Sequence, residues 1–406
     1  MSKVIIIGGG AAGMMAAGYA SMYGADVTLL EKMPRPGRKI LISGKGRCNL
    51  TNACDVNTFM ENVPVNNKFL YSAINNFTPY DIIDFFEGLG LRTKVERGNR
   101  VFPVSDKAMD VVDAMRSFAL SYGARLVNAE AHDVVAENGQ VKGVVWNGKL
   151  RDCDSVIIAT GGMSYQRTGS TGDGYRFAEN LGHTITKITP SLVPLESPDK
   201  DCKRLQGLSL KNVGLKITEE NGRTVYTDFG EMLFTHFGLS GPMILSASCS
   251  LKSFDKNYTA SIDLKPALSD EQLDLRLQRD FKENINKAVS NSLSKLLPKK
   301  LIPVVLDRWG TDPSKKCNSV TKEERKALLN ILKHFTIKIS GVRPIEEAII
   351  TSGGVKVSEI NPKTMESKLV KGLYFAGEVI DVDAYTGGFN LTIAWATGKL
   401  AGENAV

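Results

Sequence analysis

Short apolar runs separated by glycine-rich turns dominate the start of the chain. Residues 4–7 form a β-branched run of the kind found in buried parallel strands. Residues 11–23 are rich in alanine and methionine and predict a helix, and residues 26–30 predict a second strand. This order of strand, helix and strand predicts a βαβ unit and therefore an α/β fold with a parallel sheet.

The next part of the chain predicts further helices and strands of the same unit. Thr78 is suited to be a helix N-cap, Pro79 to be the first helical residue, and Asp81 lies in the first turn. Ser105 is similarly expected to cap a helix over about 106–122. Strands are predicted over 125–136, 141–146 and 155–159.

Beyond about residue 190 the pattern changes. Residues 191–262 hold short strand-like pieces with turns, and 267 to about 335 is helical, with capping boxes Ser269-x-x-Gln272 and Thr321-x-x-Glu324. Strands and glycines return after about 340, and a helix is expected over about 390–404. The predicted domains are a discontinuous nucleotide-binding domain (1–190 plus 338–406), a β-rich insert (191–266 plus about 326–337) and a helical subdomain (267–325).

Composition agrees with a multidomain globular protein. The chain has 406 residues, of which 42% are hydrophobic and 23% charged, so one compact core is not expected. The sequence predicts no signal peptide and contains no apolar run long enough to span a bilayer. The six cysteines are scattered and form no C-x-x-C pair, which predicts reduced thiols, no metal site and a cytoplasmic location.

The chain is basic, with a formal net charge of +7. Residues 191–337 contain 23 Lys and Arg against 18 Asp and Glu, so most of the excess lies there. A solvated basic surface is the simplest interpretation, and an anionic small-molecule substrate is the alternative. Nucleic acid is not favoured, because no cluster of aromatic and basic residues accompanies the charge.

A dinucleotide-binding motif follows the first strand. In Gly8-Gly9-Gly10-Ala11-Ala12-Gly13 the first glycine permits the tight turn and Gly10 lets the backbone approach a pyrophosphate. Gly13 allows close packing of helix and strand. Glu31, at the end of the second strand, is suited to accept hydrogen bonds from ribose hydroxyls and would repel a 2′-phosphate. The predicted contacts are Gly8, Gly10, Ala12, Gly13 and Glu31; a glycine turn without a ligand is the alternative.

The residues after Glu31 favour FAD over NAD. The loop 34–54 is rich in Gly, Arg and Asn and is not a typical continuation of an NAD dehydrogenase. Basic side chains here are candidates for phosphate or ribose contacts, and polar ones for the ribityl chain and flavin edge; surface-loop roles are the alternative. These candidates are Lys32, Arg38, Lys39, Ser43, Gly44, Asn49, Thr51 and Asn52.

Three later segments complete the predicted FAD site. Residues 156–162 (VIIATGG) read as a buried strand ending in A-T-G-G, and 169–175 (GSTGDGY) as a glycine turn that passes close to a planar group. In 372–391 a strand is followed by a Gly387-Gly388 turn, which directs the N-terminus of the next helix at the flavin and stabilises negative charge there. Further predicted contacts are Val134, Thr160, Gly161, Gly377, Glu378, Gly388, Asn390 and Leu391.

Together these segments resemble the BaiN/RdsA-type flavoproteins, which include a bile-acid dienone reductase and an aminoacetone oxidase. The most specific pieces are 43–52 (SGKGRCNLTN), 234–242 (FTHFGLSGP) and 351–355 (TSGGV). The T-G-D-G segment also looks like that of fumarate-reductase-type flavoproteins. The resemblance implies a Rossmann-type FAD domain with a β-rich insert, and a small helical domain inside that insert.

The expected activity is FAD-dependent reduction of an activated C=C, with a 3-oxo-4,6-diene steroid of the bile-acid type as substrate. Protonation of the substrate carbon needs an acid, for which Tyr165 and His236 are candidates; structural roles are the alternative for both. A second nucleotide fingerprint is absent from the sequence, so NAD(P)H is expected only as a transient electron donor. Alternative functions are an aminoacetone-type amine oxidase that uses oxygen, and a flavin-bound redox sensor or nucleic-acid-modifying partner.

Overall fold

The computed structural model of the chain describes residues 1–251, 253–254 and 257–406. It divides into two compact units. The first unit comprises Met1–Ser191 and Pro344–Val406, and the second comprises Leu192–Arg343. The second unit is therefore an insertion in the chain of the first. A separate helical subdomain inside the second unit stays a prediction.

A parallel sheet forms the centre of the first unit, with the first strand of the chain in its middle. Every neighbouring pair is parallel, and the last strand of the chain adds to one edge. Both chain ends therefore build one sheet, as the sequence predicted. In spatial order its strands are β20 (Leu373–Phe375), β10 (Ser155–Ile158), β1 (Lys3–Ile7), β2 (Asp26–Glu31) and β6 (Arg125–Asn128).

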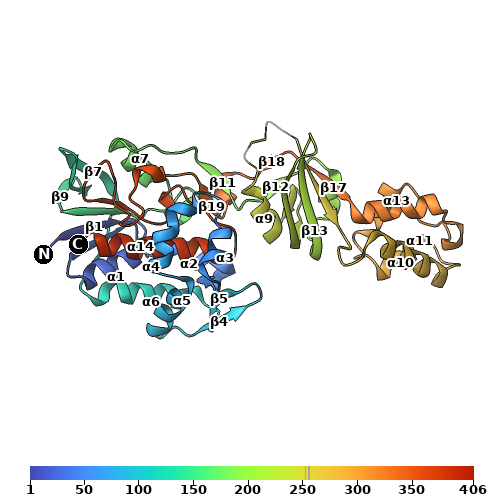
Figure 1. Cartoon of the computed structure of the whole chain (residues 1–406), viewed down its shortest axis with the longest axis horizontal. Coiled ribbons are helices and arrows are strands. Elements are labelled where there is room, and N and C mark those ends of the chain that lie inside the picture. The colour runs from blue at the N-terminus through green and yellow to red at the C-terminus, as the bar shows by residue number, and fades with distance from the viewer. Residues whose placement is uncertain (252, 255–256) are drawn as a thin grey trace. The chain divides into compact units, whose positions relative to one another are not determined.

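The first and last helices of the chain, α1 (Ala11–Met22) and α14 (Phe389–Asn404), pack side by side in this unit (Figure 1). Glycines of α14 make the contact possible. A Cβ on Gly398 would lie 2.4 Å from the carbonyl oxygen of Ala12, and one on Gly402 would lie 2.5 Å from that of Ala16. The two backbones therefore approach more closely than larger side chains permit.

Smaller elements surround this core. The additional sheets are β7–β8–β9 (Ala131–Glu137, Gln140–Trp146, Lys149–Asp152), β3–β5–β4 (Thr51–Asn52, Arg100–Pro103, Thr93–Glu96) and β11–β19 (Thr189–Ser191, Ile350–Ser352). The other helices are α2 (Arg38–Ile42), α3 (Val56–Glu61), α4 (Tyr71–Asn76), α5 (Pro79–Gly88), α6 (Ala108–Ser121) and α7 (Asp173–Asn180).

The second unit combines an antiparallel sheet with helices (Figure 1). The strands, in spatial order, are β17 (Phe335–Ile339), β16 (Tyr258–Asp263), β13 (Ser209–Glu219), β14 (Thr224–Phe234), β15 (Gly238–Ser240), β12 (Leu195–Glu196) and β18 (Gly341–Val342). The helices are α8 (Lys200–Arg204), α9 (Pro242–Ser248), α10 (Asp270–Glu283), α11 (Val289–Ser292), α12 (Ile302–Trp309) and α13 (Lys322–Lys333). Among the described residues, no helix is long and apolar enough to cross a membrane.

Most predicted helix starts are confirmed, and some boundaries are wrong. Thr78, Ser269 and Thr321 each cap a helix through a reciprocal capping box. Ser105 does not cap α6, whose N-cap is Lys107 without a side-chain bond. The predicted strand 125–136 is interrupted between β6 and β7, and the expected loop 34–54 contains α2. The strands β13 and β14 are longer than the short pieces expected, because they pair along their length as one hairpin.

Asp383 is a buried carboxyl that joins distant segments of the first unit. Its side chain is 1% exposed and accepts hydrogen bonds from the hydroxyls of Ser191 (3.0 Å) and Ser352 (3.1 Å). Burial raises its pKa to about 6, the nearby Asp381 and Glu378 charges add to the increase, and the two serine bonds oppose it. The native state therefore binds a proton at this carboxyl more tightly than the unfolded chain does.

Replacing Gly398 by alanine should destabilise the protein by about 1–3 kcal/mol, because the added Cβ overlaps the backbone of α1. Urea unfolding followed by circular dichroism measures the change. Gly88→Ala is the matched control, since Gly88 also lies in a helix and a Cβ there would meet nothing within 4 Å. Equal unfolding midpoints for the two variants would contradict the close α1–α14 contact.

Asp383 should make stability depend on pH. Its folded pKa lies above the unfolded value, so between about pH 4 and pH 6 the native state binds more protons. The free energy of unfolding should therefore fall as pH rises through this window, by about 3 kcal/mol from this group. In Asp383→Asn the contribution disappears, so the variant should gain stability relative to wild type from pH 4 to pH 7. Parallel curves for the two proteins would show that Asp383 does not titrate in this way.

Candidate cofactor and active site

A cleft lies at the carboxyl ends of the parallel strands in the first unit. Its lining includes a residue at or just beyond the end of every strand of that sheet. In open α/β sheets, ligands bind outside the carboxyl ends of the strands. These strand-end residues are Gly8 after β1, Glu31 of β2, Ala129 after β6, Ala159 after β10 and Ala376 after β20.

The predicted glycine turn has the expected geometry. Gly8 has φ +106°, and a Cβ there would lie 2.5 Å from the carbonyl oxygen of Ala159. A Cβ on Gly13 would lie 1.8 Å from the carbonyl oxygen of Gly8, so there is no room for any side chain between helix α1 and the end of strand β1. Gly10 lines the cleft, and a Cβ there would meet nothing within 4 Å. The N-terminus of α1 is therefore open for an anionic group.

Glu31 is held in place by the chain itself. Its two carboxylate oxygens accept hydrogen bonds from the backbone N–H groups of Gly9 (2.8 Å) and Met33 (2.7 Å). Burial raises the pKa of Glu31, while these two bonds favour the charged form. Each carboxylate oxygen can accept more than one hydrogen bond, so the group can still bind ribose hydroxyls.

The turn 169–172 lies against the residues that follow Glu31. The Lys32 ammonium pairs with Asp173 (2.5 Å) and donates to the hydroxyl of Thr171 (2.5 Å). Both charged residues line the cleft. Burial raises the pKa of Asp173, but hydrogen bonds from Lys32 and Thr171 outweigh it and lower the pKa. Lys32 therefore bridges two predicted motifs at this end of the cleft.

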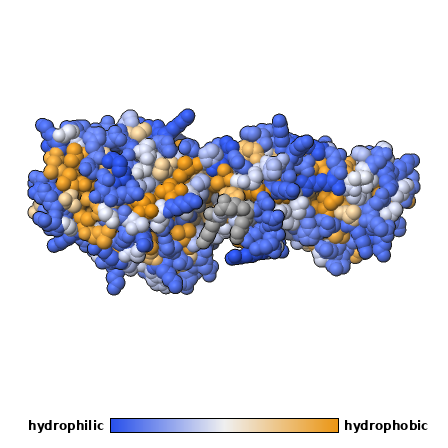
Figure 2. Space-filling model, turned by 90° about the horizontal axis from the view of Figure 1, so that it is seen from above, coloured by the Kyte–Doolittle hydropathy of each residue, from blue (hydrophilic) through white to orange (hydrophobic). Residues whose placement is uncertain are grey.

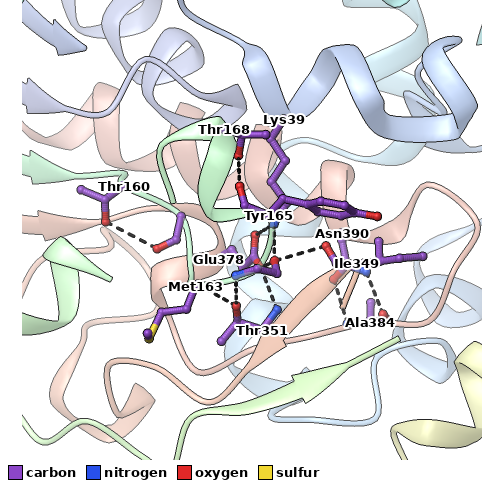
Figure 3. Close-up of polar contacts among 12 residues, drawn as sticks. Lys39, Thr160, Met163, Tyr165, Thr168, Ile349, Thr351, Glu378, Ala384 and Asn390 are labelled. Carbon is purple, nitrogen blue, oxygen red and sulfur yellow. Dashed lines mark hydrogen bonds and ion pairs between the residues drawn. The ribbon is translucent and has the colours of Figure 1, made fainter. Parts of the chain in front are cut away.

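Another polar network lies at Glu378. Lys39 pairs with Glu378 (2.5 Å) and donates to the hydroxyl of Ser164 (2.8 Å). Glu378 also accepts bonds from the Ser164 hydroxyl (3.1 Å) and the Thr351 backbone N–H (2.8 Å). Figure 3 shows Lys39, Glu378 and Thr351 gathered at one place. Ser164 and Thr351 are buried, whereas the ammonium and carboxylate partners both line the cleft.

Two predicted contacts instead hold the turn before α14. The hydroxyl of Thr51 is 2.7 Å from that of Thr392, and the Asn52 amide donates to the carbonyl of Gly387 (3.1 Å). A Cβ on Gly388 would lie 2.4 Å from the oxygen of Thr51. These residues therefore fix the position of the α14 N-terminus.

The cleft gathers most predicted cofactor residues, although not all of them. Those that line it are Gly8, Gly10, Ala12, Glu31, Lys32, Arg38, Lys39, Ser43, Thr160, Gly161, Gly377, Glu378, Asn390 and Leu391. Those outside its lining are Gly13, Gly44, Asn49, Thr51, Asn52, Val134 and Gly388.

Of these outer residues, Val134 is a buried residue of β7, which makes a packing role simpler than ligand contact. Asn49 differs from the rest. Its side-chain oxygen is buried and has no hydrogen-bond partner within the described ranges. An unpaired buried acceptor of this kind is costly, so a bound donor would satisfy it.

The two candidate acids have different surroundings. Tyr165 has φ +53°, a left-handed conformation that is rare for a bulky residue. Figure 3 shows it next to the network, and its carbonyl accepts a bond from the hydroxyl of Thr168 (2.8 Å). Burial raises the pKa of Tyr165 above the ordinary tyrosine value. His236 belongs to the second unit, is exposed and lies against the ring of Phe237.

Sequence reasoning missed two parts of the lining. Ala129–Ala131 follow β6, and the rule that ligands bind at strand ends could have indicated them. Ile349 and Ile350 also line the cleft, but they come from the chain that returns from the second unit. Their position depends on the pairing of β19 with β11, for which the sequence carried no signal.

Comparisons with known proteins show the family of the chain. The family model described as the HI0933-like protein Rossmann domain matches residues 2–404. The 3-dehydro-bile acid delta(4,6)-reductase of Clostridium scindens is 31% identical, with 100% of this chain and 99% of that protein covered. The ribosomal RNA dihydrouridine synthase of Escherichia coli is 32% identical over 99% of this chain and 97% of its own.

A solved structure gives the same fold. The 3-ketosteroid delta1-dehydrogenase of Sterolibacterium denitrificans covers 100% of this chain and 99% of its own, with a TM-score of 0.50 at 14% identity. The predicted fold class, the resemblance to a flavoprotein family and the prediction of a flavin-dependent oxidoreductase are confirmed. From the family match over nearly its whole length, the chain belongs to the HI0933-like Rossmann family.

Proposed function

We propose that the protein binds FAD non-covalently in the cleft of the first unit and uses it to reduce a C=C conjugated to a carbonyl. The cofactor proposal rests on one observation. Residues at the carboxyl ends of all the parallel strands line the cleft, and the Gly10 turn before α1 lines it too, with open space beside Gly10. Glu31 would hold the adenosine ribose, and the N-terminus of α1 the pyrophosphate.

At the other end of the cleft, the paired Lys39 and Glu378 offer a hydrogen-bond donor and an acceptor side by side. This pair suits a chain of hydroxyl groups such as the ribityl chain of FAD. The N-terminus of α14 lies in the same region, since Asn390 and Leu391 line the cleft. Bound FAD supplies the hydride for the reaction at its N5 atom.

The chain supplies the proton. Tyr165 is the candidate acid for the substrate carbon next to the carbonyl, because a tyrosine hydroxyl is protonated at neutral pH and the residue lies beside the Lys39–Glu378 network. Its left-handed backbone is a second indication, since such conformations are concentrated at functional sites. His236 stays the alternative acid.

The reaction class is supported by two kinds of relative. One is named a 3-dehydro-bile acid delta(4,6)-reductase and others ribosomal RNA dihydrouridine synthases. A 3-oxo-4,6-diene and the uracil ring both contain a C=C conjugated to a carbonyl. A steroid dienone of the bile-acid type is our first candidate substrate. A uridine within RNA is the second, and the positive charge of the second unit favours it. Cys48, Cys54, Cys153, Cys202 and Cys317 are free thiols, which supports our proposal that the protein works in the cytoplasm.

Glu31→Gln should weaken FAD binding by about 10- to 100-fold, because an amide is a weaker acceptor for ribose hydroxyls than a carboxylate. Titration of the apoprotein with FAD, followed by flavin fluorescence, measures the affinity. Glu137→Gln is the matched control, since Glu137 is exposed on β7. Equal affinities for wild type and Glu31→Gln would refute the ribose contact.

The reaction itself is tested with anaerobically reduced holoprotein. Dithionite or NADPH serves as the reductant, and NADPH also tests for a transient nicotinamide donor. Adding a 3-oxo-4,6-diene steroid should restore the oxidised flavin absorbance and yield the product in which one C=C is reduced, seen by mass spectrometry as a gain of two hydrogen atoms. A uridine-containing RNA is the second substrate in the same assay.

Tyr165→Phe should slow this reoxidation by about 100-fold or more while FAD affinity is kept. Tyr80→Phe, an exposed tyrosine of α5, is its control. Rapid reoxidation by air with peroxide release, and none by either C=C substrate, would instead indicate an oxidase and reject the reductase.

A further inference from the structure

The positive charge of the chain is confined to one unit. The first unit contains 26 Lys and Arg and 26 Asp and Glu, so it is neutral. The second unit contains 25 Lys and Arg against 18 Asp and Glu, which is the whole net charge of +7. Figure 2 shows one face of the molecule, on which the second unit is mostly hydrophilic. An uneven distribution of this size indicates a partner of opposite charge.

Basic residues from separate segments of the second unit meet near α8. Arg308 of α12 pairs with Asp201 of α8 (2.7 Å). The Lys300 ammonium, just before α12, donates to the carbonyl of Gln206, just after α8. These contacts bring residues 200–206 and 299–308 to one surface.

Strand β17 adds to the same surface. The Arg308 guanidinium donates to the carbonyl of Thr336 (2.7 Å). The backbone N–H of Lys338 donates to the carboxylate of Asp199 (2.8 Å). Strand β17 is an edge strand of the sheet, and the side chain of Lys338 on it is exposed.

The acidic residues of this region are already engaged. Asp201 pairs with both Arg204 (3.2 Å) and Arg308, and Asp307 pairs with Arg204 (2.5 Å). Asp199 accepts the backbone bond from β17. The carboxylates therefore neutralise the arginines and leave the lysines without acidic partners.

Exposed lysines remain, and in the part of the chain that the structure describes no carboxylate pairs with their ammonium groups. We call them the lysine surface: Lys200, Lys203, Lys299, Lys300 and Lys338. Charged side chains that are neither paired nor buried are the groups that bind phosphates and release counterions.

We propose that the lysine surface binds the phosphodiester backbone of RNA. The inference rests on the second candidate substrate of the proposed function and adds where the chain contacts it. A bile-acid carboxylate carries one charge and needs one or two cations, whereas five ammonium groups on one surface suit an extended polyanion. The sequence did not favour nucleic acid, because no cluster of aromatic and basic residues accompanies the charge. The lysines of this surface come from separate segments and meet only in the folded unit.

The test is the salt dependence of RNA binding by the full-length holoprotein. A fluorescein-labelled single-stranded RNA of mixed sequence is titrated, and its anisotropy gives the affinity at several salt concentrations. Five phosphate contacts predict a slope of about −3.5 for log K against log salt. Lys203→Ala, Lys299→Ala and Lys338→Ala combined should lower the steepness by about 2 and weaken binding at least about tenfold.

The control removes three exposed lysines of the neutral first unit, Lys142, Lys149 and Lys371, and should leave affinity and slope unchanged. Glutamine replacements at the surface positions serve if the alanine variant does not fold. An unchanged slope in the surface variant, or no RNA binding by wild type, would overturn the inference. Reoxidation by the steroid dienone is measured on the same proteins, and it should not change, so failure of the reductase proposal is seen separately.

Discussion

The backbone contact between the first and last helices is the constraint on which the rest of the first unit depends. Gly398 and Gly402 let α14 lie directly on the backbone of α1 at Ala12 and Ala16. With α14 in this position, its first turn at Asn390 and Leu391 and the glycine turn at Gly8 and Gly10 line the same cleft. The N-termini of two helices then face one space, which explains why residues from opposite ends of the chain form a single site.

Local signals in the sequence identified the parts of the site that depend on local geometry. The glycine turn, the acid that ends β2 and the capping boxes are each encoded within a few residues, and the structure confirms their geometry. The short helix α2 was missed because a helix of this length has little stability of its own and forms through its tertiary contacts. Thr51 and Asn52 were assigned to the cofactor, and the turn that they hold could not be known without the position of α14.

Pairings between residues far apart in the sequence could not be predicted either, because they depend on how the elements are assembled in space. Lys39 and Glu378 are 339 positions apart, and each was predicted separately as a cofactor contact. Their bond through buried Ser164 and Thr351 makes them one unit of fixed geometry, which lowers the cost of organising a site when a ligand arrives. The lysine surface is a similar case, since its members become neighbours only when α8, α12 and β17 are assembled.

The parallel sheet also has a consequence for how the chain is made. Its middle strand β1 is synthesised first, whereas the edge strand β20 and the helix α14 are synthesised last. Domains generally begin to fold during synthesis, starting from the N-terminus. Here the insert of 192–343 is complete before the surrounding unit has all its strands. The contacts of β10 with β20 and of α1 with α14 can therefore form only after residues 373–404 have left the ribosome.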